Sequence, residues 1–278
     1  MNETNFSDES ILKLIKLPDL LSVLNALLGF TAILFVLRKA NASAIENALV
    51  LILAAAVVDG LDGVVARKIG CSPIGKYLDS LADMVSFGVA PAIVTYVLLN
   101  DYLHVYAYTY ITLAFCGAYV ISGMLRLARF DAKPFLCGAP PHDPASPVRA
   151  YKESFTKETK SPFSTGSVLE KEKVYFEGFP ITMAAISLAS FMLVFIELPL
   201  NFYPYFFLLI ALMGVLCGLM TSRIRYRNRR DKRIAIPIGI IFFTLFFFYV
   251  FSLPFVYPAA IIFVLTASYI ISPFFSLF

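Results

Sequence analysis

The chain has 278 residues, of which 59% are hydrophobic and only 15% are charged, and its mean hydropathy is +0.78. This composition excludes an ordinary water-soluble domain, in which about a quarter of the residues are charged. We therefore expect an all-α, polytopic integral membrane protein in contact with membrane lipids. The net charge of +4 fits a positive surface facing anionic lipid and gives no reason to expect nucleic acid as a partner.

The first residues carry acidic side chains and lack the basic start and apolar core of a signal peptide. Within them, the stretch ILKLIKL at residues 11–17 is typical of a short helix that lies in the membrane interface. A plain lead-in to the first membrane span is the other interpretation. We treat residues 1–19 as an N-terminal interfacial segment.

Apolar runs long enough to cross a bilayer follow along the rest of the chain, because a span needs about 20 apolar residues. No residue after Arg233 is charged, and we divide this last region into two helices at the Ser252-Leu253-Pro254 break. The sequence thus predicts about eight transmembrane helices, at residues 20–37, 47–66, 78–100, 105–125, 178–196, 203–222, 234–252 and 256–275.

Lys and Arg residues concentrate in the cytoplasmic loops of membrane proteins. If the N-terminus is cytoplasmic, all of the 23 Lys and Arg residues except Arg38 and Lys39 fall on the cytoplasmic side. This distribution predicts that both termini are cytoplasmic. It also predicts that the stretch at residues 59–83, which joins the second and third spans, lies at the cytoplasmic face.

Four aspartates stand in this stretch. Asp59 and Asp62 are three residues apart at the end of the second span, and Asp79 and Asp83 are four apart at the start of the third. Each spacing puts a pair on one helical face, and a short loop with Gly and Pro makes the two helices antiparallel neighbours. We therefore expect the four carboxylates to converge.

Converging carboxylates beside the hydrocarbon need a cation to offset their repulsion. Oxygen ligands without Cys or His favour Mg²⁺ or Mn²⁺ over zinc, and two metal ions flanked by aspartates recur in phosphoryl displacement. Gly63 and Gly75 would leave room for close backbone approach, and Arg67 could hold a phosphate. The sequence therefore predicts a two-ion site that handles a phosphate ester.

The pattern Asp59-x2-Asp62-Gly63-x2-Ala66-Arg67-x7-Gly75-x3-Asp79-x3-Asp83 resembles the signature of the CDP-alcohol phosphatidyltransferases. Members of that family pass the phosphoryl-bearing part of a CDP-linked alcohol to an acceptor hydroxyl and release CMP. Four further segments are similar to those of its serine-specific branch, the CDP-diacylglycerol–serine phosphatidyltransferases and archaetidylserine synthases. These segments are LDSLADMVSFGVAPA (78–92), RLARF (126–130), YFEGFP (175–180) and LMTSRIRY (219–226).

The resemblance implies a membrane enzyme that joins CDP-diacylglycerol or CDP-archaeol to L-serine, works with two Mg²⁺ or Mn²⁺ ions and forms a homodimer. It implies that Asp59, Asp62 and Asp79 bind the metal ions, and that Asp83 completes the metal site and acts as the general base. Spacing alone does not choose the base. The resemblance also implies contacts with the CDP-lipid from four residues, Gly63, Arg67, Ser72 and Gly75.

The serine carboxylate suits a bidentate arginine. Arg126 and Arg129, near the cytoplasmic end of the fourth span, are candidates for this contact, although both also fit simple anchors at the membrane interface. Asn25, a polar residue inside the first span, is a third candidate for the serine site. A plain hydrogen bond between helices explains Asn25 equally well.

The sequence departs from the family pattern in three places. Asp19 follows Pro18 where the family often has Asn, and Asp131 follows RLARF where Asn is usual, which adds a negative charge near the expected serine site. Residues 131–177 form a polar insertion, interpreted as a lid or as a disordered loop. The insertion separates a catalytic core at 20–130 from C-terminal transmembrane helices at 178–278.

Other functions stay open at this point. The same family includes enzymes with other acceptors, such as glycerol 3-phosphate or inositol phosphate. An ion-coupled transporter is the alternative from a different class, since carboxylates within a membrane also mark cation pathways. A transporter predicts acidic residues spread near the bilayer midplane, whereas here they gather with Gly and Arg at one face. A lipid-binding protein without catalysis gives no reason for a metal site.

Overall fold

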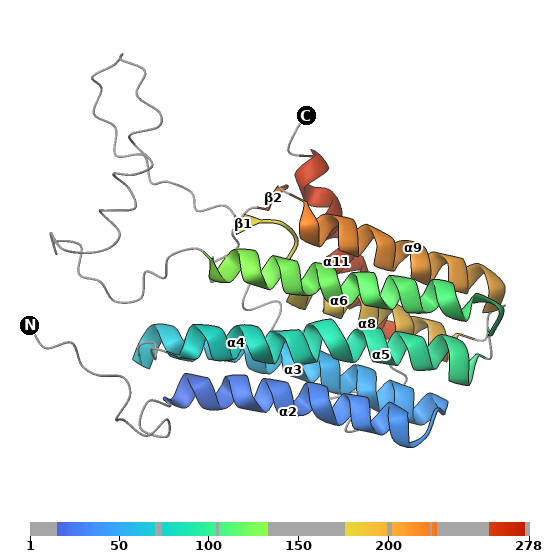
Figure 1. Cartoon of the computed structure of the whole chain (residues 1–278), viewed down its shortest axis with the longest axis horizontal. Helices are drawn as coiled ribbons and strands as arrows, with labels where there is room; N and C mark the ends of the chain where they lie inside the picture. The colour runs from blue at the N-terminus through green and yellow to red at the C-terminus, as the bar shows by residue number, and fades with distance from the viewer. Residues whose placement is uncertain are drawn as a thin grey trace, which may run out of the picture.

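The computed structural model of the chain is a bundle of long helices (Figure 1). It describes residues 16–69, 74–103, 106–132, 176–198, 202–222, 224–226 and 256–275. Within these ranges all the long elements are helical, as the composition predicts. The helices are α2 (Leu17–Arg38), α3 (Ala42–Ile69), α4 (Gly75–Asp83), α5 (Ala90–Val97), α6 (Thr109–Asp131), α8 (Ile181–Glu197), α9 (Phe202–Thr221) and α11 (Val256–Phe275).

Seven of the eight predicted spans coincide with these helices, and the eighth, residues 234–252, lies outside the described residues. Four stretches are long and apolar enough to cross a membrane, namely Leu17–Arg38, Ala42–Ala66, Gly75–Asp101 and Tyr106–Asp131. The apolar stretches of α8, α9 and α11 are shorter. The protein is thus an integral membrane protein with four candidate spans among the described residues.

Some predicted boundaries shift. The first helix begins at Leu17, inside the segment assigned to the interface, and α6 continues to Asp131 instead of ending at 125. Helix α6 extends because RLARF contains no Gly or Pro and remains helical. The ILKLIKL stretch up to residue 15 and most of the insertion, residues 133–175, lie outside the described residues.

The third span is a continuous helical rod in which two π-helical segments, η1 (Met84–Val89) and η2 (Leu98–Tyr102), flank α5. Pro91 has no N–H and cannot donate to the carbonyl of Phe87, four residues earlier. The hydroxyl of Tyr119 on α6 donates to that carbonyl at 3.1 Å. The wide turn of η1 begins directly after Asp83, and π-helical turns often occur at functional sites.

Helices α2 and α3 pack along each other, α8 packs against α3 and α11, and α6 packs against α9. Figure 1 shows the end of α6 and the starts of α2, α4 and α8 at the same end of the bundle, on the left. One face of α3 is fully buried and includes Ile45, Leu49 and Ile52. Helix α2 instead exposes several leucines, which suits a surface turned to lipid.

Helix α2 approaches η1 very closely at Gly29. A Cβ atom on Gly29 would lie 2.5 Å from the Cα of Ser86 and would also collide with the Ser86 hydroxyl. At the same contact the Ser86 hydroxyl donates to the carbonyl of Asn25 at 2.7 Å. Only glycine allows this approach, which places α2 against the segment that follows Asp83.

Two of the segments that carry the family resemblance meet in a short antiparallel pair of strands, β1 (Phe176–Glu177) and β2 (Arg225–Tyr226). The sequence did not predict this pair. Gly178 follows β1 with φ +85°, and its N–H donates to the carbonyl of Ile224 at 3.0 Å. The YFEGFP and LMTSRIRY segments are therefore neighbours at the start of α8 and the end of α9.

Gly29→Ala should destabilise the protein, because the added methyl group forces α2 away from the backbone of η1. Overpacking of this kind costs about 1–3 kcal/mol. Thermal unfolding in detergent, followed by circular dichroism, measures the effect. Gly117→Ala is the matched control, since a Cβ at Gly117 of α6 meets nothing within 4 Å. Equal unfolding temperatures for the two variants would contradict the close contact.

Candidate functional site

Three of the four aspartates form one cluster between α3 and α4, in the half of the bundle where α4 and α8 begin. Carboxylate oxygens of Asp59, Asp79 and Asp83 all lie within 4.8 Å of one another. Asp83 is buried, while Asp59 and Asp79 are partly exposed. The predicted pairing of the two helices is thus confirmed for these three residues, which we call the aspartate cluster.

Asp62 lies beside the aspartate cluster and is not part of it. Its carboxylate accepts a hydrogen bond from the hydroxyl of Ser22 on α2 at 2.6 Å. The charge of Asp62 still interacts with the charges of Asp59 and Asp79. The sequence predicted that all four carboxylates converge, and three of them do. The fourth, Asp62, is hydrogen-bonded to α2.

Hydrogen bonds from neighbouring helices hold two members of the cluster. The side-chain amide of Asn25 donates from Nδ2 to Asp83 Oδ1 at 3.2 Å, and the hydroxyl of Thr182 donates to Asp59 Oδ2 at 3.4 Å. Each hydrogen bond ties a cluster residue to a helix distant in sequence, α2 or α8. These two carboxylates are thereby held relative to α2 and α8.

Sequence reasoning missed Ser22 and Thr182. Ser22 is three residues before Asn25 in a largely apolar helix, so the spacing alone puts both polar side chains on one helical face. That signal was available. The sequence signal for Thr182 was weaker. Threonine is common in the first turn of an apolar helix, and only the position of Thr182 after YFEGFP distinguishes it.

Arg126 of α6 is the sequence-predicted arginine that reaches the aspartate cluster. Its charge interacts with those of Asp83 and Asp59, and its side chain is partly exposed, like those of Asp59 and Asp79. One guanidinium does not neutralise three carboxylates. The excess of negative charge and the all-oxygen donor set therefore fit a hard divalent cation such as Mg²⁺ or Mn²⁺.

Arg129 has a different environment, although it lies only one turn after Arg126. Its guanidinium donates to the carbonyl oxygens of Ser222 at 3.3 Å and Thr221 at 3.2 Å, at the end of α9. The last carbonyls of a helix have no donor within that helix, and a cationic side chain satisfies them well. Arg129 thus links the RLARF segment to the LMTSRIRY segment.

Two of the three departures from the family pattern, Asp19 and Asp131, have local partners. Asp19 is buried and accepts the backbone N–H of Lys16 at 2.7 Å, which caps the start of α2. Asp131, the last residue of α6, forms an ion pair with Lys76 at 3.7 Å and accepts the hydroxyl of Ser80 at 3.1 Å. The negative charge that Asp131 adds near the expected serine site is therefore paired with Lys76 of α4.

The four residues predicted to contact the CDP-lipid are described only in part. A Cβ at Gly63 would meet nothing within 4 Å, so space is open beside α3 at this point. Gly75 is the first residue of α4. The side chain of Arg67 and all of Ser72 lie outside what the structure describes.

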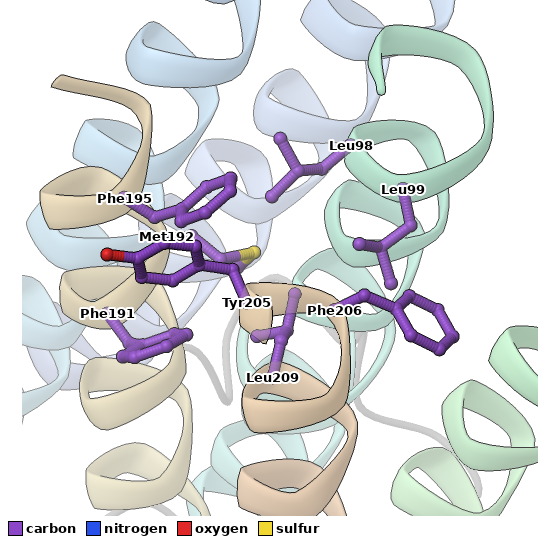
Figure 2. A pocket seen from close by; sticks show the side chains of 8 residues that line it. All are labelled: Leu98, Leu99, Phe191, Met192, Phe195, Tyr205, Phe206 and Leu209. Atoms are coloured by element: carbon purple, nitrogen blue, oxygen red, sulfur yellow. The ribbon is translucent and has the colours of Figure 1, made fainter. Parts of the chain in front are cut away.

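A small hollow elsewhere is apolar and unrelated to the aspartates (Figure 2). It lies between η2 and the facing ends of α8 and α9, and it is too narrow to hold a water molecule. Thr182 and the cluster are at the other end of α8. Its lining residues are Leu98, Leu99, Phe191, Met192, Phe195, Tyr205, Phe206 and Leu209.

Comparison with known proteins agrees with this geometry. A family model described as CDP-alcohol phosphatidyltransferase matches residues 15–135, which include all four aspartates. The chain is 30% identical over 258 residues to the CDP-diacylglycerol–serine O-phosphatidyltransferase of Helicobacter pylori, covering 91% of this chain and 87% of that protein. The chain belongs to the CDP-alcohol phosphatidyltransferase family.

Two further relatives are more similar over a shorter length. The archaetidylserine synthase of Methanothermobacter thermautotrophicus is 42% identical over 128 residues, which are 45% of this chain and 51% of that protein. A CDP-diacylglycerol–serine O-phosphatidyltransferase of Mycobacterium leprae is 44% identical over 117 residues, which are 42% of this chain and 36% of that protein. The matched parts thus span about half and about a third of these relatives.

Asp79→Asn should weaken binding of Mn²⁺ by at least about tenfold, because the change removes one charge from the aspartate cluster and keeps the shape of the side chain. Electron paramagnetic resonance of Mn²⁺ added to the detergent-purified protein measures binding without turnover. The control is Glu46→Gln, which removes a carboxylate of α3 whose charge interacts with Glu197 of α8. Similar Mn²⁺ affinity in both variants would rule out the cluster as the metal site.

Proposed function

We propose that the protein transfers the phosphatidyl group of CDP-diacylglycerol, or the archaetidyl group of CDP-archaeol, to the hydroxyl of L-serine and releases CMP. The observation that carries this proposal is the aspartate cluster, with its buried Asp83 and one neighbouring arginine. It supports chemistry on a phosphate ester, and the family signature contains the same residues.

Serine as the acceptor rests on two kinds of support. Relatives from bacteria and an archaeon are named as serine-specific or archaetidylserine enzymes. The YFEGFP segment, which resembles that branch, leads directly into α8, where Thr182 bonds to Asp59. Glycerol 3-phosphate and inositol phosphate remain the alternative acceptors within the family.

Asp59, Asp62, Asp79 and Asp83 would hold two Mg²⁺ or Mn²⁺ ions. When bound, the ions would neutralise the diphosphate and stabilise CMP as the leaving group. The position of Asp62 beside the cluster, within reach of the charges of Asp59 and Asp79, is compatible with a site wider than one ion. Gly63, Arg67, Ser72 and Gly75 would contact the CDP part of the lipid.

Asp83 is the proposed general base. It is buried and held by the amide of Asn25, so its carboxylate has a fixed direction. Asp83 would take the proton of the serine hydroxyl, and the serine oxygen would attack the lipid-side phosphorus. The bond between this phosphorus and the oxygen of CMP breaks, and CMP leaves with the electron pair.

Arg126 is the preferred partner for the serine carboxylate, because its charge faces the aspartate cluster. Arg129 is the second candidate, and its hydrogen bonds to the end of α9 favour Arg126 for this contact. Asn25 is the third serine-site candidate, placed directly beside Asp83.

The site lies where helices begin and end, which suits a water-soluble serine and a lipid whose chains remain in the bilayer. We place it at the cytoplasmic face, with both termini cytoplasmic, on the distribution of Lys and Arg. The core at 20–130, the insertion at 131–177 and the helices at 178–278 are the proposed divisions of the chain. A homodimer is proposed from the family resemblance.

An ion-coupled transporter remains the alternative of a different class. It predicts carboxylates along a path through the membrane. The aspartate cluster is instead gathered at one end of the bundle, beside a glycine with open space next to it. This grouping favours the enzyme.

Release of CMP by the detergent-purified protein tests the function. The protein receives CDP-diacylglycerol or CDP-archaeol with Mg²⁺ or Mn²⁺, and L-serine, glycerol 3-phosphate or inositol phosphate. Release that depends on serine and stops with a chelator supports the proposal. Release with another acceptor overturns the choice of serine, and no release with any pair of substrates favours the transporter.

Asp83→Asn should abolish serine-dependent CMP release, because the amide cannot take the proton of the hydroxyl. Loss of a general base lowers the rate by about 10²–10⁴-fold. Binding of CDP-diacylglycerol, measured by equilibrium dialysis, should stay close to that of the unchanged chain. Ser80→Ala on the same helix is the control and should retain turnover. Robust activity in Asp83→Asn would refute the assignment of the base.

Arg126→Ala should raise the KM for serine by at least about tenfold and change the KM for CDP-diacylglycerol much less, because a bond between charged groups is lost. Arg129→Ala is the matched control. It should lower the unfolding temperature and leave the KM for serine within about twofold. If both variants keep the KM for serine, Arg126 is only an anchor, and if only Arg129→Ala raises it, the two roles are reversed.

A further inference from the structure

Asn25 is a fully buried polar side chain in a helix whose outer face is apolar. Its two ends have different surroundings. The Nδ2 amide donates to Asp83 Oδ1 at 3.2 Å. In this arrangement the amide nitrogen is bonded to Asp83 and the amide oxygen is not.

The Oδ1 atom of Asn25 has no hydrogen-bond donor among the described residues. A buried amide oxygen without a donor is rare in folded proteins, because it loses its bonds to water and gains nothing in return. Ser187 provides the one other buried side-chain atom of this kind in the described part of the chain, and it lies within α8. Only the oxygen of Asn25 belongs to a residue that contacts the aspartate cluster.

Contacts on both sides of Asn25 hold the residue in place. Its own carbonyl accepts the Ser86 hydroxyl at 2.7 Å, and the contact between Gly29 and Ser86 holds α2 against η1. The backbone is thus held on one side and the amide nitrogen on the other. The free acceptor is a fixed feature next to Asp83.

We propose that Asn25 Oδ1 accepts a hydrogen bond from the α-ammonium group of the acceptor amino acid, while Nδ2 positions Asp83. This inference rests on the proposed function and names the atom that recognises the amine. An ammonium group offers three N–H donors and a positive charge, and both suit a buried oxygen beside a carboxylate.

Asp83 and its two neighbours, Arg126 and Asn25, then correspond to the three functional groups of serine. Asp83 faces the hydroxyl, Arg126 attracts the carboxylate, and Asn25 accepts from the ammonium. In serine the amine and the hydroxyl are on neighbouring carbons, so they reach neighbouring acceptors. Glycerol 3-phosphate has no ammonium group and would leave Oδ1 without a donor, which makes Asn25 a determinant of specificity.

The test compares serine with 3-hydroxypropionate, which keeps the hydroxyl and the carboxylate and lacks the amine. Each compound is tested as the acceptor in CMP release by the full chain with CDP-diacylglycerol and Mn²⁺. If 3-hydroxypropionate does not react, its affinity is measured as a competitive inhibitor of the reaction with serine. In Asn25→Ala the preference for serine should fall at least about tenfold. Ser22→Ala, which affects Asp62 from the same helix, should lower the rate with both compounds and keep the preference.

Asn25→Asp separates the two roles of the amide. An aspartate keeps an oxygen for the ammonium and loses the donor to Asp83, so the preference for serine should persist while kcat falls. Asn25→Asp also provides a test if Asn25→Ala does not fold, which thermal unfolding reveals. Loss of the preference with an unchanged kcat in Asn25→Asp would overturn the inference.

Two further results would overturn it. One is an unchanged preference for serine in a folded Asn25→Ala protein. The other is an Asn25→Ala protein that needs a higher Mn²⁺ concentration for half-maximal activity and keeps its preference for serine. That result would make Oδ1 a ligand of the metal. A wild-type protein that ignores serine and uses another acceptor would instead refute the proposed function, so the two failures are distinguishable.

Discussion

The repulsion among neighbouring carboxylates is the constraint on which the rest of the site depends. Asp59, Asp79 and Asp83 bring more negative charge together than Arg126 offsets. The fold maintains this arrangement with hydrogen bonds from α2 and α8 and with a close helix contact at Gly29. Such an excess of negative charge supports the proposal that cations and a phosphate-bearing substrate bind there.

Helix α2 has a larger part in this arrangement than its apolar composition suggests. Its exposed leucines face outward, while Ser22 and Asn25 reach one aspartate from each of two other helices. A polar group inside a membrane helix is costly unless it is paired. Their placement on one face therefore means that α2 orients the aspartates, although it contributes none of the four motif aspartates.

The sequence was sufficient for the features that depend on simple periodicity and charge. Seven of the eight spans predicted from hydropathy coincide with helices, and four of the helical stretches are long and apolar enough to cross a membrane. The spacing of Asp59, Asp79 and Asp83 predicted that they lie together, as the structure shows. The sequence could not reveal that Asp62 is hydrogen-bonded to Ser22, because that bond joins residues 40 positions apart. Nor could it separate Arg126 from Arg129, whose partners lie on different helices and are set by packing.

The departures from the family pattern show how the site tolerates change at its edge. Asp131 adds a negative charge whose field reaches Asp79, yet Lys76 and Ser80 of α4 bind its carboxylate. Lys76 also donates to the backbone carbonyl of Asp131 at 2.8 Å, so the pair joins the end of α6 to the start of α4. Because α4 provides both Asp79 and Asp83, the added charge is compensated on the same helix that it would otherwise disturb. The substitution thus becomes a further connection between α6, which provides Arg126, and the helix of the proposed base.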